Sequence, residues 1–284
     1  MPEYETIGAL GSCCGVDDIL VIARANQLCT EYGLDTISTG VTVAFGMECY
    51  EEGVLTRKDT GGLELSFGNG EAVLELIEQI ANRRGFGDLL AEGVMRASRR
   101  IGRGTEKYAM HVKGQELPMH EPKPKHALGV GYAVSPTGAD HCHSMHDTKF
   151  TTAAGIADWK ALGILQPVES RDLGPDKVRL ATYVMNWEHC MNSQVICRFL
   201  PWDVLGAADL VRSATGWNAS SFELMKLGER VATMVHVYNV REGFSNQDDT
   251  VPGRLLEPFA SGPLEGVRCC KHRQPWRVRV PKAP

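Results

Sequence analysis

The 284-residue sequence has no hydrophobic run that approaches the roughly 18 residues needed to cross a bilayer. Its first six residues carry acidic rather than basic side chains, which is not the pattern of a secretory signal. No two of its nine cysteines have the C-x-x-C spacing of zinc ribbons or redox motifs. These absences argue against a membrane protein and a disulfide scaffold, and they predict a cytoplasmic protein.

Positive charge is scarce outside the C-terminal end of the chain. The formal net charge is -5, but residues 268–284 hold six of the 30 Lys and Arg residues and no acid, which leaves 24 basic against 35 acidic residues in 1–267. An acidic body disfavours nucleic acid as a partner. The segment 268–284 has no helical or strand period, and it reads either as a disordered basic tail or as a foreign reading frame.

Helical periodicity dominates the rest of the sequence. Apolar residues recur at helical spacing, with glycine next to the end of each of the first four stretches and a capping box at Ser220 and Glu223 before the last. The predicted helices cover 17–32, 40–52, 71–84, 88–101, 176–188, 202–214 and 220–240. The segment 107–148 is too rich in glycine and proline for long elements. The predicted fold is all-α and multihelical, with helical subdomains at 1–110 and 111–267.

Two stretches carry potential chemistry. Residues 140–147 contain His141, His143 and His146, which favour either a mononuclear metal hydrolase or a polar loop with partly exposed histidines. Residues 33–40 hold an aspartate, two threonines and a serine before a predicted helix. These side chains either cap that helix or offer a carboxylate and free N–H groups to a polar ring system.

Six strings occur in order along residues 2–267 and together resemble the aldehyde:ferredoxin oxidoreductase family of tungstopterin enzymes. They are PEYETIGALGS, GLDTISTG, IANRRGFGDLLAEGV, YAMHVKGQELPMHEP, YAVSPTGADH and REGFSNQDDTVPGRLLEP. These strings are more similar to those of the benzoyl-CoA-reductase-like and uncharacterised anaerobe members than to those of the archaeal aldehyde enzymes. The resemblance implies the two helical domains that follow the β-rich domain of such an enzyme.

The resemblance implies a tungsten or molybdenum ion held by two pterins, next to a [4Fe-4S] cluster. Paired D-x-x-G-L-(D or C) motifs contact the pterins in that family, and they fall on 30–35 and 192–197 of this sequence. The implied pterin contacts are Thr30, Gly33, Leu34, Asp35, Asn192 and Ile196, with Thr30 and Asn192 in place of aspartate. Cys197 matches a cluster ligand, and Lys113 is a candidate phosphate or loop contact.

The resemblance also implies the catalytic groups. The family's active-site glutamate falls on Glu5, with Tyr4 beside it, and its histidine falls on His141. A carboxylate and an imidazole suit the oxidation of an aldehyde, because that reaction needs proton acceptors of moderate pKa. The family's dimer-interface iron motif is not seen in residues 24–27.

The family's β-rich domain and its run of three cluster cysteines have no counterpart in this sequence. We therefore expect a truncated fragment or a subunit of an iron–sulfur oxidoreductase. Its expected partners are ferredoxin or another electron-transfer subunit, a separate chain with the β-rich pterin domain, and a second copy of itself. The alternative is a catalytically inactive helical binding or scaffold module.

Overall fold

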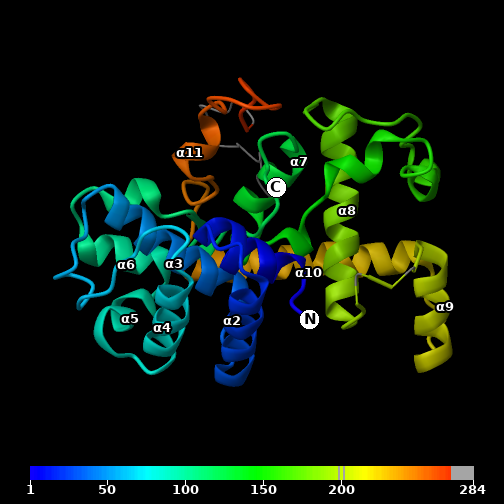
Figure 1. Ribbon diagram of the computed structural model, residues 1–284. Helices are drawn as coiled ribbons and strands as arrows, with labels where there is room; N and C mark the ends of the chain where they lie inside the picture. Colours follow the sequence, from blue (N-terminus) through cyan, green and yellow to red (C-terminus); the bar gives the residue numbers. More distant parts are fainter. Residues whose placement is uncertain (198, 201, 270–284) are drawn as a thin grey trace. The chain divides into compact units, whose positions relative to one another are not determined.

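Helices make up most of the structure, as the periodicity predicts. The computed structural model describes residues 1–197, 199–200 and 202–269 (Figure 1). This part of the chain divides into two compact units. Unit 1 contains Met1–His120 and Pro252–Arg254, and unit 2 contains Glu121–Val251 and the described residues from Leu255 onward. The subdomain limits at residues 110 and 267 stay predictions.

Unit 1 is built from short and medium helices and one small hairpin. Its regular elements are α1 (Tyr4–Thr6), the turns Ile7–Gly11 and Ser12–Cys14, α2 (Ile19–Tyr32), α3 (Thr36–Glu51), α4 (Gly70–Ala81), α5 (Gly85–Leu90), α6 (Gly93–Ile101), the 3-10 turn Thr105–Tyr108, β1 (His111–Val112) and β2 (Gln115–Glu116). The two strands pair antiparallel, with His111 opposite Glu116. Helix α3 lies in the core, where Val43, Phe45 and Met47 are almost fully buried.

Local capping explains why α2 has the predicted limits. The Asp18 side chain accepts a hydrogen bond from the Leu20 N–H at 2.8 Å, and Gly33 ends the helix with φ of 68°. A left-handed residue at this place is a common helix stop that glycine adopts without strain. The prediction that this helix begins at Asp17 or Asp18 and stops at Gly33 is confirmed.

The single helix predicted over 88–101 is wrong, because the chain forms α5 and α6 with a break between them. Gly93 has φ of 75°, and the buried Glu116 accepts a hydrogen bond from the Val94 N–H at 2.8 Å. That carboxylate comes from strand β2, 22 residues further along the chain. It accepts the Val94 N–H, one of the backbone donors at the start of α6 that have no partner within the helix. No residue inside the predicted helix supplies that acceptor.

Unit 2 contains the longest helices. Its elements are α7 (His126–Val134), the 3-10 turns η4 (His141–His143), η5 (Asp147–Thr151) and η6 (Ala157–Leu162), α8 (Pro175–Ser193), α9 (Val204–Thr215) and α10 (Ser221–Arg241), and α11 (Gly253–Leu256) begins in unit 1 and ends in unit 2. The capping box of Ser220 and Glu223 starts α10 as predicted.

Helix α7 lies inside the segment expected to be irregular. Its glycines are required by close neighbours rather than by turns, because a side chain at Gly131 would overlap Ser144 and one at Gly129 would overlap the Cys269 sulfur. Cys269 is buried, and its N–H donates to the Leu255 carbonyl at 2.9 Å. Cys269 therefore packs in unit 2, Arg268 beside it is exposed, and residues 270–284 of the expected tail lie outside the described residues.

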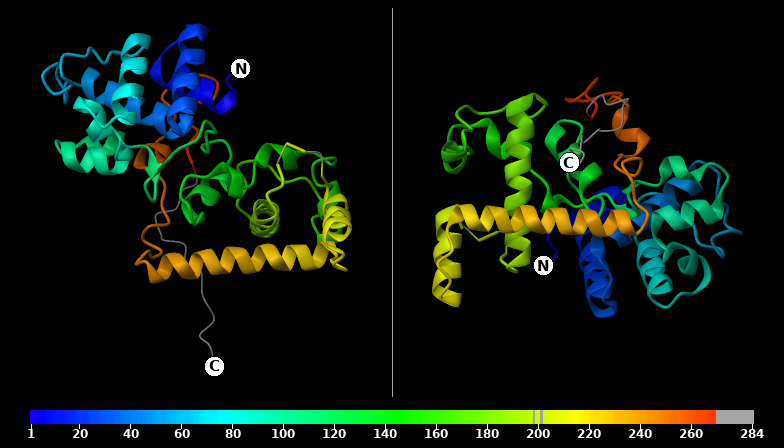
Figure 2. Two further views of the ribbon diagram at one scale, coloured as in Figure 1. Left: turned by 90° about the horizontal axis from the view of Figure 1, so that it is seen from below. Right: turned by 180° about the vertical axis from the view of Figure 1, so that it is seen from behind.

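Helices α8 and α10 cross steeply in unit 2, and three views agree on this crossing (Figures 1 and 2). The crossing point is Gly228 on α10. A side chain there would overlap the carbonyl oxygen of Asn186 on α8. Glycine is therefore the residue that lets the two backbones approach.

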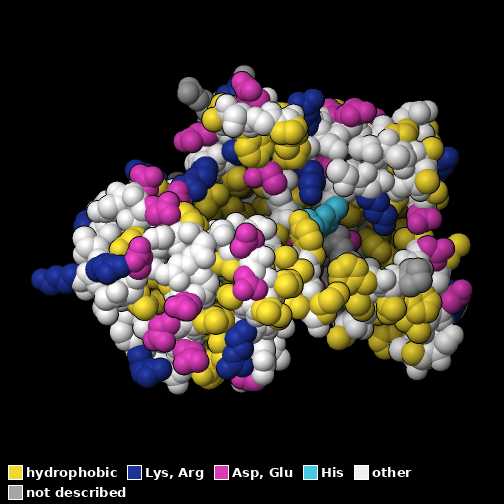
Figure 3. Space-filling view, viewed as in Figure 1, with side chains coloured by type: hydrophobic (Ala, Val, Ile, Leu, Met, Phe, Trp, Pro, Cys, Tyr) yellow, Lys and Arg dark blue, Asp and Glu magenta, His cyan; other side chains and the backbone are white. Residues whose placement is uncertain are grey.

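Hydrophobic side chains are exposed where α8 leads into α9. Val195, Phe199 and Leu205 are 91%, 90% and 67% exposed. Figure 3 shows hydrophobic side chains gathered over α9 and the lower end of α8. Exposed apolar surface of this kind marks an interaction site in many proteins.

No single helix in the described residues is long and apolar enough to cross a membrane. Tyr4–Cys14 and Ile19–Tyr32 reach the required length and composition only as a pair bent by 118°.

We predict that Gly228→Ala lowers the free energy of unfolding by roughly 1–3 kcal/mol, because the methyl group forces α8 and α10 apart. Urea unfolding followed by circular dichroism measures the change. Gly253→Ala is the matched control, since a side chain at that helical position meets no atom within 4 Å. Equal stability of the two variants would contradict the close crossing.

Candidate functional site

The predicted site residues fall on both units, and their surroundings differ from one unit to the other. In unit 1, Glu5 is buried with 6% exposure on the first helical turn of the chain. Its Oε2 accepts a hydrogen bond from the Met119 N–H at 2.8 Å, and its Oε1 lies 3.0 Å from Nε2 of His120. Tyr4 is exposed and donates its hydroxyl to the Met119 carbonyl at 2.7 Å.

The loop of the first pterin motif lies between α2 and α3 in unit 1. Asp35 is exposed and caps α3, with Oδ2 accepting from the Ser38 N–H at 2.7 Å. Thr30 donates its hydroxyl to the Asn26 carbonyl at 2.9 Å within α2. Leu34 packs against the core of unit 1, and Gly33 supplies the left-handed turn. The capping interpretation of Asp35 is confirmed.

Lys113 lies in the turn between β1 and β2. It adopts a left-handed backbone with φ of 51°. Gly114 follows it and donates its N–H to Nδ1 of His111 at 3.2 Å. The structure gives Lys113 a place in a tight turn of unit 1, and its contact with a phosphate stays a prediction.

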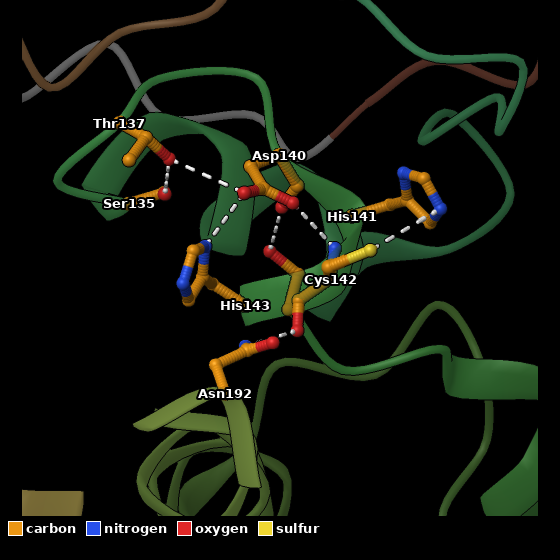
Figure 4. Close-up of polar contacts among 8 residues, drawn as sticks. Ser135, Thr137, Asp140, His141, Cys142, His143 and Asn192 are labelled. Atoms are coloured by element: carbon orange, nitrogen blue, oxygen red, sulfur yellow. Dashed lines mark hydrogen bonds and ion pairs between the residues drawn. The ribbon is translucent and has the colours of Figure 1, made fainter. Parts of the chain in front are cut away.

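Asp140 organises the candidate residues of unit 2 around one carboxylate (Figure 4). Its Oδ1 accepts from the Cys142 N–H at 2.6 Å, and its Oδ2 pairs with Nδ1 of His143 at 2.7 Å. Nε2 of His141 lies 3.7 Å from the Cys142 sulfur. Asn192 in the last turn of α8 donates its side-chain amide to the Cys142 carbonyl at 3.3 Å. One carboxylate thus shapes the turn that presents His141.

The metal ligands expected at His141, His143 and His146 do not come together as a trio. His143 is turned to Asp140, and its ring lies 4.8 Å from the ring of His189. The group whose ligand atoms all lie within 4.8 Å in this unit is Asp140, His141 and Cys142. The three-histidine hydrolase site is therefore not formed.

Burial and charge shift the pKa values of Asp140 and His189 in unit 2. Burial by itself raises the pKa of Asp140, but the hydrogen bond and charge of His143 and the Cys142 amide outweigh it and hold the pKa at about 2. His189 on α8 is buried, and burial with the nearby charge of His143 lowers its pKa to about 4. His189 therefore stays neutral in the folded protein near neutral pH.

We predict that stability falls between pH 6.5 and pH 4 because of His189. In this window the unfolded chain takes up a proton on this imidazole that the folded chain does not, so the free energy of unfolding decreases as the pH falls. The contribution is roughly 2–3 kcal/mol over the whole window. Urea unfolding at a series of pH values should give a shallower decrease for His189→Phe, and identical slopes would contradict the prediction.

A fully buried ion pair anchors the segment that carries Asp140 and His141. Nζ of Lys177 on α8 lies 2.5 Å from Oδ1 of Asp147, and both side chains are at most 1% exposed. The Asp147 carboxylate also accepts the N–H groups of Ala127 and Leu128 at the start of α7. It therefore joins α7, η5 and α8 in unit 2.

We predict that Asp147→Asn lowers the free energy of unfolding by about 3–5 kcal/mol, because it leaves the Lys177 charge buried without its partner. The added replacement Lys177→Met should recover part of this loss. Asp209→Asn, which breaks an exposed pair with Arg212, is the control and should have little effect. Urea unfolding measures all three, and a small loss for Asp147→Asn alone would refute the assignment.

The second motif, Asn192–Cys197, continues from the last turn of α8. Val195 has a left-handed backbone with φ of 56°, and Ile196 packs partly against the core of unit 2. Cys197 is exposed. Arg198, a basic neighbour of the kind that favours a thiolate, lies outside the described residues.

The family assignment comes from comparison with known proteins. The family model for aldehyde ferredoxin oxidoreductase, domains 2 and 3, matches residues 1–276. The chain belongs to the aldehyde ferredoxin oxidoreductase family. The resemblance of its sequence strings to that family is thus confirmed, together with the all-α fold.

The relatives of this family member are longer than the chain. The tungsten-containing aldehyde ferredoxin oxidoreductase of Pyrococcus abyssi is 36% identical over 273 residues, which cover 93% of this chain and 43% of the relative. The enzyme of the same name from Pyrococcus furiosus is 35% identical over 271 residues with the same coverage. The aliphatic sulfonate oxidoreductase, WOR-like subunit, of Pyrococcus furiosus is 29% identical over 280 residues, 93% of this chain and 40% of the relative. The chain thus spans less than half the length of these relatives.

A solved structure has the same fold. It is the active site complex BamBC of benzoyl coenzyme A reductase with 1,5-dienoyl-CoA, with a TM-score of 0.72 and 21% sequence identity. The match covers 89% of this chain and 43% of that chain. The likeness at this identity establishes the fold of this family member.

Two histidines beside the predicted residues were missed by sequence analysis. His120 lies 115 residues from Glu5 in the sequence, so no local pattern connects them. His189 precedes Asn192 by three residues on α8, a spacing that puts both on one helix face. That spacing is a usable signal, since Asn192 was already a candidate.

Proposed function

We propose that this chain is the helical part of a tungstopterin iron–sulfur oxidoreductase that oxidises an aldehyde or another oxo donor and passes two electrons toward ferredoxin. The observation that carries the proposal is the family match over residues 1–276, within which Glu5 is a buried, hydrogen-bonded carboxylate. Its relatives are tungsten-containing enzymes of that name.

The first motif fits a pterin in its donor chemistry. Asp35 and Thr30 are exposed oxygen-bearing side chains at the junction of α2 and α3, where pterin amines would find acceptors. Asn192 and Ile196 are the corresponding candidates of unit 2. A bound tungsten or molybdenum pterin would take up the electrons released by oxidation.

The cluster does not fit the described part of this chain. A [4Fe-4S] cluster needs four thiolates. Where the structure describes the chain, no three cysteine sulfurs converge, and Cys197 is the single matching ligand. The remaining ligands would have to come from another segment or chain.

Glu5 and His141 are the proposed proton acceptors. The Met119 N–H donates to Oε2 of Glu5, and Nε2 of His120 lies 3.0 Å from Oε1, so both oxygens of this carboxylate have a nearby polar group. His141 is presented by the η4 turn that Asp140 organises. Tyr4 would contribute a hydroxyl next to Glu5.

A polypeptide partner is part of the proposal. The exposed Val195, Phe199 and Leu205 offer an apolar surface next to Cys197, which suits contact with a segment that supplies the β-rich domain and three cysteines. The structural relative BamBC is itself a complex. A homodimer stays a prediction.

The second candidate is a helical binding or scaffold module without redox chemistry. The engagement of the Thr30 hydroxyl within α2 favours it, because that group is then shared with the helix backbone. The absence of converging thiolates among the described residues points the same way.

The proposal is tested by anaerobic co-expression of the chain with the part of a Pyrococcus relative that the chain does not span. We expect bound tungsten or molybdenum and an electron paramagnetic resonance signal of a reduced cluster. Cys197→Ser should remove the cluster signal, because it replaces a thiolate ligand.

Cys13→Ser, at another exposed cysteine, is the control and should keep the cluster signal. Metal-free protein in every preparation would instead support the scaffold module.

A further inference from the structure

The loop of Met119 and His120 is clamped to the first helical turn in unit 1. Glu5 accepts the Met119 N–H, and the Tyr4 hydroxyl donates to the Met119 carbonyl. Nε2 of His120 lies 3.0 Å from Oε1 of Glu5, an ion-pair contact in the imidazolium form. Two neighbouring residues of the helix thus contact two neighbouring residues of the loop.

The His120 ring is held on its face as well. The Tyr4 and His120 ring centroids are 5.3 Å apart, with the planes tilted by 33°. Tyr4 thus contacts the ring of the same histidine whose Nε2 lies 3.0 Å from the carboxylate. The His120 side chain is 22% exposed, whereas that of Glu5 is 7% exposed.

Gly8 sets the distance between helix and loop. A side chain there would lie 2.5 Å from Cγ of Met119, so glycine is needed for the approach. The Cys13 thiol donates to the Met119 sulfur at 3.4 Å on the same side. Burial and the negative charge of Glu5 raise the pKa of Cys13, so this thiol stays protonated near neutral pH.

We propose that His120 is the positioning residue for Glu5. The contact of its Nε2 with Oε1 of Glu5 keeps the buried carboxylate ionised and oriented. The inference rests on the proposed role of Glu5 as proton acceptor. Burying an ionised carboxylate is costly unless it is paired, and an unpaired one takes up a proton instead. A protonated Glu5 has lost its capacity as a base.

The first experiment uses infrared spectroscopy of the full chain near neutral pH. The wild type should lack a protonated-carboxyl band assignable to Glu5. His120→Phe keeps an aromatic ring but removes Nε2, the partner of the Glu5 carboxylate, and it should produce that band. The double variant Glu5→Gln/His120→Phe should lack it, and this assigns the band to Glu5.

Tyr4→Phe is the matched control, because it keeps the ring contact and deletes only the hydrogen bond to Met119. It should give the wild-type spectrum. A wild-type spectrum for His120→Phe would overturn the inference. His120→Leu puts the same question to a smaller side chain if the phenylalanine variant does not fold.

The second experiment measures turnover per bound metal in the co-expressed enzyme. We expect His120→Phe to lose about 10²-fold or more, the scale of a lost general base. No further loss should appear when it is added to Glu5→Gln. A purely structural role would lower the yield and leave turnover per metal unchanged, which would also overturn the inference.

The two experiments separate the two proposals. Suppose that His120→Phe gives the new carboxyl band but that the co-expressed protein never binds metal. The pairing of His120 with Glu5 is then supported, and only the proposed oxidoreductase function is refuted.

Discussion

The buried ion pair of Asp147 and Lys177 is the interaction on which unit 2 depends. The segment between residues 121 and 174 is mostly turns, and it cannot satisfy its own backbone donors as a long helix does. Asp147 accepts two N–H groups of α7 and pairs with a lysine of α8. A charge in that position is stable because its oxygens contact several donors at once. The η4 turn with His141 comes six residues before Asp147, so it is held by the same anchor.

The same device recurs in unit 1. Glu116 accepts the Val94 N–H at the start of α6, and Glu5 accepts the N–H of Met119. In each case a buried carboxylate satisfies a backbone donor that lies more than 20 residues away in the sequence. Such carboxylates stabilise irregular connections, since an unpaired buried amide is costly. Glu5 differs from Glu116 in that a histidine nitrogen, Nε2 of His120, also lies 3.0 Å from its carboxylate.

The candidate site residues of the two units carry different functional groups. Unit 1 brings an aromatic hydroxyl, a carboxylate and an imidazole together around residues 4, 5 and 120. Unit 2 presents an imidazole beside a thiol, on a turn shaped by Asp140 and tied to α8 by Asn192.

The sequence by itself determined the helical class, the family and those helix limits that depend on neighbours within four residues. Asp18, Gly33, Ser220 and Glu223 act on the helices they flank, so their signals are visible in a short window. The break before α6, the helix α7 and the pairing of His120 with Glu5 were decided by the tertiary structure alone. Their causes are Glu116, Asp147 and a loop 114 residues from the first helix, contacts that exist only once the chain has folded. Local capping is encoded beside each helix, whereas long-range pairing depends on the path of the whole chain.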